Sequence, residues 1–253
     1  MKNKTILLSV FLLLWVGLVS AYEESMPNMI SPTKLEKGNI ELSIRHRFLG
    51  AVNDETFDTF FGMDRGANIN LGLRIPVISN TEMFFKYIRS NSEYNFGISY
   101  KLPKPLLNIN SQFNLEYFTF EKIGIIERRN NFLYLLALQT DSALKRVTPT
   151  LNLLYDGYYE TFGTALGLNI RVSKDWSFQT EFSPVLYRQS DLDNRITVGE
   201  KDYFSFAVKY QTYAHHFVFL VSNGSQIGSR SIIQGTNSND LFFGFNIQRK
   251  LYF

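Results

Sequence analysis

The C-terminal stretch 240–253 is the feature that most constrains the fold of this chain. Its side chains alternate between two faces over more than ten residues, and a period of two is the pattern of a β-strand. One face carries Phe243, Phe245, Ile247, Arg249, Leu251 and Phe253, and the other carries Gly244, Asn246, Gln248, Lys250 and Tyr252. Strands of soluble proteins usually have about five or six residues, whereas a tilted strand that crosses a bilayer needs about 9–11. The stretch therefore predicts a membrane-crossing strand.

The same alternation recurs along the chain from residue 39 onward. The expected strands are 39–48, 67–75, 82–89, 93–102, 109–120, 131–141, 147–156, 162–173, 175–187, 201–213, 215–223 and 240–253. The strand 131–141 is apolar on both faces, which leaves its register open. An even number of strands is the rule for single-chain bacterial barrels. The pattern predicts an all-β protein: a single antiparallel transmembrane β-barrel of about 12 strands that spans residues 39–253.

The lengths of the connections support this interpretation. Bacterial barrels have short periplasmic turns and longer extracellular loops. The connections at 49–66, 188–200 and 224–239 are long and follow odd-numbered strands, whereas 76–81, 103–108 and 142–146 are short and follow even-numbered ones. The odd connections 90–92 and 157–161 are short and break the trend. Both chain ends are expected on the periplasmic side.

The N-terminus predicts export from the cytoplasm. Lys2 and Lys4 precede an apolar run at 6–19, and small residues at 19–21 form a cleavage site, which is the pattern of a signal peptide. We expect residues 1–21 to be removed and 22–38 to form an N-terminal periplasmic tail. The formal net charge is only +3, and loss of the leader removes two lysines, so nothing favours nucleic acid as a partner.

Composition limits the chemistry that the chain can carry out. Aromatic residues make up 15% of the sequence, as expected where rings face lipid or lie in interfacial girdles. Cysteine is absent, which excludes disulfides, thiolate nucleophiles and cysteine metal sites. We expect no cofactor and no metal.

Four segments carry a resemblance to a known family: 46–48 (HRF), 62–72 (GMDRGANINLG), 216–224 (HFVFLVSNG) and 243–249 (FGFNIQR). In this order they resemble an uncharacterised family of Bacteroidota-type outer-membrane β-barrel proteins, a domain of unknown function. The resemblance implies a barrel in the outer membrane and supplies no catalytic residues. The chain extends through 250–253, a residue or two beyond the family pattern. The terminal Phe253 resembles the signal by which outer-membrane barrels are delivered to the barrel-assembly machinery.

The histidines do not predict an enzyme. His46 falls on the lipid-facing side of its strand, where twelve-stranded outer-membrane phospholipases place a catalytic histidine. Such chemistry would also need a serine within hydrogen-bond reach, and Ser43 lies on the opposite face of the same strand. His215 and His216 are adjacent and point to opposite faces, so they suit interfacial positions better than one metal ion. We expect no catalytic residue.

Polar residues at inward positions predict a charged lumen. The candidate lumen wall consists of Glu41, Arg45, Arg47, Asn68, Asn70, Arg74, Lys101, Glu116, Arg171, Glu181 and Lys209. Charges inside a membrane protein are paired or face water. Two interpretations stay open: a closed barrel filled by ion pairs, or a narrow water-filled pore whose wall charges select solutes. A twelve-stranded barrel is of intermediate size and fits both.

The first long loop carries the second candidate site. Phe57, Phe60 and Phe61 have the spacing of one apolar stripe on a short amphipathic helix, with acidic residues between them. We expect this helix to lie at the mouth of the barrel, either packed on the rim or acting as a constriction over the lumen.

These observations predict an outer-membrane barrel that passes small polar solutes without chemistry of its own. The alternative is a closed barrel that serves as scaffold, receptor or subunit of an envelope complex, and a lipid-modifying enzyme is a third possibility. The expected partners are outer-membrane lipids, the assembly machinery, small polar solutes and other envelope proteins.

Overall fold

The computed structural model describes residues 26–54, 56–103, 108–121, 128–140, 146–186 and 199–253. The expected signal peptide at 1–21 and most of the expected loop at 188–200 lie outside these residues. Over the described residues the chain forms twelve strands, a 3₁₀ turn and one short helix. The strands are β1 (Asn39–Phe48), β2 (Ala67–Ile78), β3 (Thr81–Ile88), β4 (Glu93–Lys101), β5 (Ile109–Glu121), β6 (Arg128–Thr140), β7 (Val147–Asp156), β8 (Thr161–Arg171), β9 (Trp176–Ser183), β10 (Tyr203–Gln211), β11 (His215–Ser222) and β12 (Phe242–Tyr252). The turn is η1 (Arg89–Asn91) and the helix is α2 (Ser229–Ile232).

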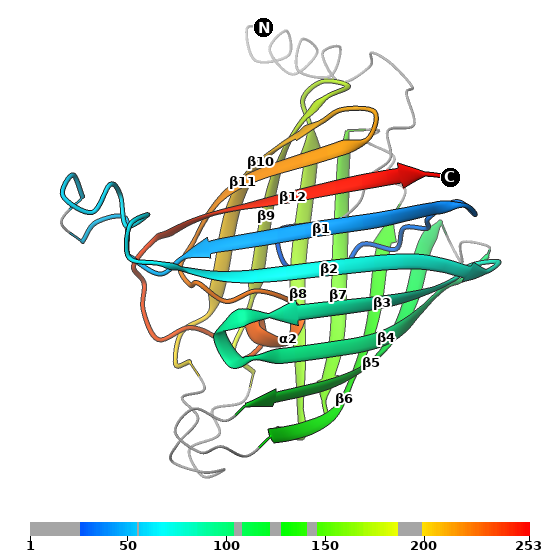
Figure 1. Ribbon diagram of the computed structural model, residues 1–253, viewed down its shortest axis with the longest axis horizontal. Helices are drawn as coiled ribbons and strands as arrows, with labels where there is room; N and C mark the ends of the chain where they lie inside the picture. The colour runs from blue at the N-terminus through cyan, green and yellow to red at the C-terminus, as the bar shows by residue number, and fades with distance from the viewer. Residues whose placement is uncertain (1–25, 55, 104–107, 122–127, 141–145, 187–198) are drawn as a thin grey trace, which may run out of the picture.

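The strands form one closed antiparallel barrel in which each pairs with its neighbours in sequence (Figure 1). The first and last strands close it, with Cα partners running from Asn39 and Tyr252 to Arg47 and Gly244. Closure gives the backbone groups of both edge strands a partner, as lipid requires. The sequence prediction of a twelve-stranded antiparallel barrel is confirmed.

The two faces of the wall match the alternation of the sequence. Outward residues such as Leu42, Ile44 and Leu71 are exposed and apolar, whereas inward residues such as Glu41 and Asn70 are buried. The outer surface is thus apolar where lipid would contact it, and the polar residues are gathered in the lumen. No helix among the described residues is long and apolar enough to cross a membrane.

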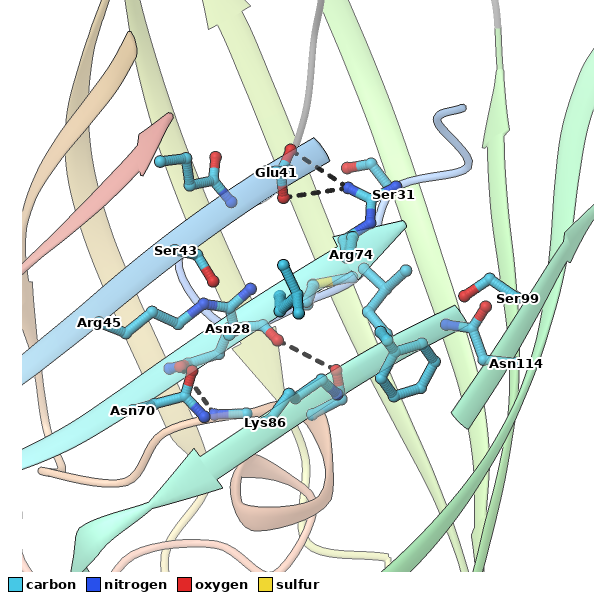
Figure 2. Close-up of a pocket in the computed structure, with 18 of the residues that line it drawn as sticks. Asn28, Ser31, Glu41, Ser43, Arg45, Asn70, Arg74, Lys86, Ser99 and Asn114 are labelled. Carbon is cyan, nitrogen blue, oxygen red and sulfur yellow. Dashed lines mark hydrogen bonds and ion pairs between the residues drawn. The ribbon is translucent and has the colours of Figure 1, made fainter. Parts of the chain in front are cut away.

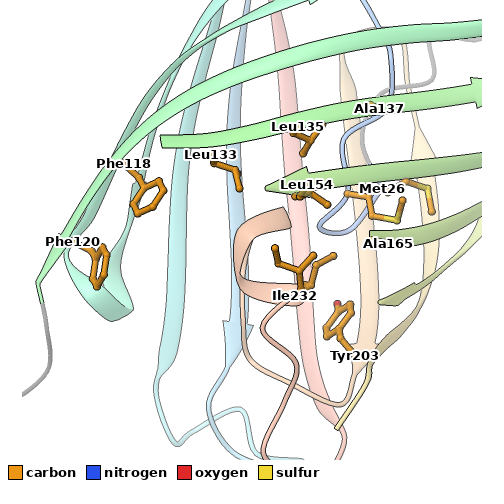
Figure 3. Close-up of a cluster of buried hydrophobic side chains, with 12 residues drawn as sticks. Met26, Phe118, Phe120, Leu133, Leu135, Ala137, Leu154, Ala165, Tyr203 and Ile232 are labelled. Carbon is orange, nitrogen blue, oxygen red and sulfur yellow. The ribbon is translucent and has the colours of Figure 1, made fainter. Parts of the chain in front are cut away.

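The strand β6 obtains its register from what lies inside the barrel. Leu133, Leu135 and Ala137 face inward and are buried, and Tyr134 faces outward. The inward residues belong to a hydrophobic cluster that also contains residues of the N-terminal segment and of α2. Figure 3 shows this cluster between the wall and the chain inside it. The strand is apolar on both faces because one face meets lipid and the other meets a segment packed in the lumen.

Substitution of Ile44 tests the orientation of the wall. Ile44 lies midway along β1, 43% exposed, between Leu71 and Ile247 on neighbouring strands. We expect Ile44→Arg to destabilise the folded barrel by about 2–4 kcal/mol. The charge of an arginine near the bilayer midplane loses its hydration and gains no ion-pair partner. Unfolding by denaturant in lipid vesicles measures this change.

Ile44→Val is the matched control and should cost about 0.5–1.5 kcal/mol. Equal stability of Ile44→Arg and Ile44→Val would contradict a lipid-facing position. A closed barrel should also migrate faster on a denaturing gel before boiling than after it.

Candidate functional site

The structure places the charged and polar residues expected on the lumen wall at inward positions of their strands. Seven are buried: Glu41, Arg47, Asn68, Asn70, Glu116, Glu181 and Lys209. Arg45 and Arg74 line a lumen cavity, and Lys101 and Arg171 share the inward parity of β4 and β8. Two groups of ion pairs hold part of this wall. Arg74 contacts Glu41 at 3.2 Å and Glu82 at 2.6 Å, and Lys86 contacts Glu116 at 2.6 Å. The acids are almost fully buried, whereas the cations are partly exposed. Glu82 and Lys86 were missing from the sequence-based set, although they follow the same alternation along β3.

The N-terminal segment 26–35 lies inside the barrel and is bound there by wall side chains. The backbone N–H groups of Asn28 and Met29 both donate to Glu181 at 2.7 Å. Ile30 exchanges two hydrogen bonds with the amide of Asn152, at 2.8 and 2.7 Å. Leu35 N donates to the Glu82 carboxylate at 2.5 Å. Buried backbone groups need such partners, and here carboxylates and amides of the wall supply them.

This placement corrects the expectation that 22–38 forms a periplasmic tail, because 26–35 occupies the lumen. The inward residues of β8 are small and leave space for the segment. A side chain at Gly167 would come within 2.8 Å of the Met26 methyl and 2.9 Å of the Met29 sulfur. In Figure 3 Met26 lies over Ala165 and Leu154, on the inner side of the strands. Small inward residues on a barrel strand were the signal that could have revealed an internal segment.

The loop between β11 and β12 also folds into the barrel. Its helix α2 buries Ile232 in the same cluster as Met26 and Met29, and a side chain at Gly163 would meet Ile233 at 2.5 Å. The loop and the N-terminal segment therefore pack against one stretch of wall, although they enter from opposite ends of the barrel.

Asn28 joins the N-terminal segment to the loop and to the wall. Its side-chain oxygen accepts from Gly228 N at 3.0 Å, and its backbone oxygen accepts from the Ser229 hydroxyl at 3.0 Å. Its amide nitrogen donates to the Tyr203 hydroxyl at 2.7 Å, and the Arg47 guanidinium donates to its side-chain oxygen at 3.3 Å. One buried side chain thus connects both inserted segments.

Arg230 fixes the loop to the wall through buried ion pairs. Its guanidinium contacts Asp156 at 2.9 Å and Glu93 at 3.0 Å, and all three side chains are buried. It also stacks over the rings of Phe118 and Phe120, at 4.0 and 4.8 Å from their centroids. A planar guanidinium suits both contacts. Neither Arg230 nor its acids were among the expected site residues. Arg230 lies in a loop, where no alternation marks its direction, whereas Glu93 and Asp156 occupy inward positions of β4 and β7 that the alternation could have revealed.

A polar cavity remains between the inserted segments and the wall of β1 to β5. Its volume, measured as the space open to the centres of water molecules, is about 70 Å³. Figure 2 shows Arg45, Asn70, Ser43 and Asn114 among the residues that line it, together with Asn28 of the inserted segment. Most of its lining residues are polar or charged, and Leu73, Phe84 and Phe85 add apolar surface, so the cavity suits water or a solute that combines polar groups with a carbon chain.

The expected amphipathic helix at the mouth of the barrel does not form. Phe60 and Phe61 have positive φ angles of 47° and 58°, followed by Gly62 at 79°, and three such residues in a row cannot lie in a right-handed helix. Short helices are marginal without a surface to pack on. Phe57 and Phe60 are instead 87% and 65% exposed.

The first loop also does not cover the lumen. It extends away from the barrel end in Figure 1, and the Phe61 ring lies 6.4 Å from that of Phe243, whose side chain is on the outward face of β12. The loop between β11 and β12 occupies the lumen instead.

The histidine positions are as the alternation predicts. His46 faces outward and stacks on Phe245 at 4.8 Å between ring centroids, while Ser43 lines the lumen cavity. These two residues do not meet. Among the described residues, no group of three or more acidic, histidine or cysteine side chains could hold a metal ion.

Comparison with known proteins establishes the family. A family model described as a membrane-bound beta barrel domain, DUF5777, matches residues 23–132 and 150–251. The chain belongs to this family. With its closed transmembrane barrel, it is an outer-membrane β-barrel protein in contact with membrane lipids. The resemblance to an uncharacterised barrel family is thereby confirmed at this level. No curated protein matches the chain.

Solved structures share the fold at low identity. A KdgM porin is similar with a TM-score of 0.54 and 9% identity, over 85% of this chain and 99% of that chain. The KdgM porin in complex with disordered oligogalacturonate gives 0.52 at 9% identity, over the same shares. A NanC porin gives 0.49 at 9% identity, again over 85% and 99%. At this identity the likeness to the two KdgM porin structures is one of fold.

Replacement of Arg230 tests the attachment of the loop. We expect Arg230→Met to destabilise the barrel by about 3–5 kcal/mol, because Glu93 and Asp156 would keep buried charges without their cation. Denaturant unfolding in detergent micelles measures the loss.

Arg128→Met is the control for this change. Arg128 pairs with Glu121 at 3.0 Å on the exposed rim, and such a pair contributes about 0–1 kcal/mol. Losses of the same size for both variants would contradict a special role of the buried pairs.

Proposed function

We propose that this protein is a passive outer-membrane pore for small polar solutes and carries out no chemistry of its own. The observation that supports this most directly is the polar cavity inside the barrel. The ion pairs of Arg74 and Lys86 tie parts of the wall together without filling that space. Its polar and charged lining suits hydrated solutes, and the apolar outer face separates it from lipid.

The two inserted segments narrow the pore in this conformation. Segment 26–35 and α2 are held by hydrogen bonds, by the ion pairs of Arg230 and by packing, and no disulfide is possible because the chain has no cysteine. Non-covalent contacts of this kind can open and close. We propose that release of the joint at Asn28 widens the path, so that the inserted segments act as a gate.

A closed barrel that serves as scaffold, receptor or subunit of an envelope complex is the second candidate. The observation that favours it is the same insertion, since a segment bound to Glu181, Asn152 and Glu82 could be a permanent filling. The two candidates differ in whether segment 26–35 ever leaves the lumen.

Other parts of the interpretation remain predictions. The Bacteroidota-type origin implied by the resemblance is one. Delivery by the barrel-assembly machinery is another, supported by Phe253, which follows β12 and is 85% exposed. A lipid-modifying activity has less support, because the outward His46 has no serine partner on its own strand.

Single-channel recording in planar bilayers tests the proposal. We expect discrete conductance steps from the refolded barrel and a larger open fraction from Asn28→Ala. That substitution removes three side-chain hydrogen bonds, at 2.7, 3.0 and 3.3 Å. Each is worth about 0.5–1.5 kcal/mol, so the open fraction should rise about tenfold or more.

Thr33→Ala is the control in the same segment, because among the described residues the Thr33 hydroxyl has a single hydrogen-bond partner, Ser31 O at 3.5 Å. It should leave the open fraction within about twofold of wild type. A folded sample, verified by its gel mobility, that gives no steps with or without Asn28→Ala would favour the closed barrel.

A further inference from the structure

Arg45 differs from the other cations that line the lumen cavity. Among the residues that the structure describes, no hydrogen bond or ion pair engages its guanidinium, and its Nε atom is shielded from solvent without a partner. In Figure 2 the Arg45 side chain reaches into the pocket and no dashed line ends on it. The neighbouring Arg74 and Lys86, by contrast, both contact carboxylates.

The acids around Arg45 are already engaged by other groups. Glu181 and Glu41 attract this cation through space and Arg74 repels it. Glu181 accepts the backbone N–H groups of Asn28 and Met29, and Glu41 is bound to Arg74. The wall therefore balances part of the charge at a distance but leaves the guanidinium without a direct counterpart. Such a group inside a membrane protein is costly unless it faces water or an anion.

The surroundings of Arg45 are suited to a polar anion. Arg45 lies inside the barrel but is only half-buried, because it borders the cavity. Ser43, Asn70 and Gln248 line the same cavity and offer a hydroxyl and two amides beside the guanidinium. A guanidinium binds a carboxylate through two parallel hydrogen bonds, and the neighbouring groups can bind hydroxyls of the same solute.

We propose that Arg45 forms an anion-binding site in the lumen and that the solute it takes is a small polar carboxylate. This inference rests on the proposed function as a pore for polar solutes and names the class of solute. The site borders Asn28, Gly228 and Ser229, so the bound carboxylate lies next to the joint between the two inserted segments. The position makes Arg45 a specificity-determining residue at the narrow part of the lumen.

Direct binding to the full, refolded barrel in detergent micelles tests the site without requiring conduction. The probes are gluconate and sorbitol, which share a hydroxylated six-carbon chain and differ in the carboxylate. Isothermal titration at fixed ionic strength should show gluconate binding about tenfold more tightly than sorbitol, as expected for a charge-assisted pair. Equal affinities for the two probes would overturn the proposal.

Three variants assign the effect to Arg45. Arg45→Gln should lower gluconate affinity about tenfold, and Arg45→Lys should retain part of it, because lysine keeps the charge and loses the two-pronged geometry. Arg128→Gln removes one cation on the exposed rim, outside this cavity, and should change affinity by less than about twofold. The proposal fails if Arg45→Gln binds like wild type, or if Arg128→Gln loses as much affinity as Arg45→Gln.

The heat-dependent gel mobility of each variant shows whether its barrel has formed. Arg45→Lys keeps the charge at this position and is therefore the variant least expected to disturb folding. Conduction is measured separately. Gluconate binding that depends on Arg45 in a barrel without conductance steps would contradict the pore and leave the site standing. If the barrel gives conductance steps but its affinity for gluconate does not change when Arg45 is replaced, the pore is supported and the binding site is contradicted.

Discussion

The structure depends on the need to satisfy every backbone polar group in a bilayer. A strand edge facing lipid would leave a row of N–H and C=O groups without partners, which costs several kcal/mol for each group. Pairing of β1 with β12 removes both edges at once. The alternation of apolar and polar side chains follows from the same closure, because each strand then has one face in lipid and one in the lumen.

The same constraint governs the inside of the barrel. Segment 26–35 and the loop around α2 bring backbone groups into a space where bulk water is limited. Carboxylates and amides of the wall accept hydrogen bonds from these groups: Glu181, Asn152 and Glu82 bind the backbone of segment 26–35. The polar lumen residues therefore have two roles, because they pair with each other and also hold inserted chain.

The inserted segments explain an asymmetry of the lumen. The wall opposite the cavity is apolar. The inserted segments pack against Leu133 and Leu135, and the absence of side chains at Gly163 and Gly167 leaves space for them. The wall of β1 to β5 beside the cavity is polar, with Arg45 and Asn70 toward the open space. The apolar side packs against the inserted chain, whereas the polar side borders the cavity and also binds the inserted chain through Glu82 and Glu93.

The sequence alone determined the barrel, its strands and the inward parity of the wall residues. It could do so because a period of two along each strand assigns every side chain to lipid or lumen. Only the tertiary structure decided what fills the lumen, which loop enters it and which cation lacks a partner. Segment 26–35 and Arg230 lie outside strands, so no periodicity marks their position. Their place depends on contacts between residues up to 219 positions apart, such as Asn246 with Pro27. Such contacts exist only once the wall has closed around them.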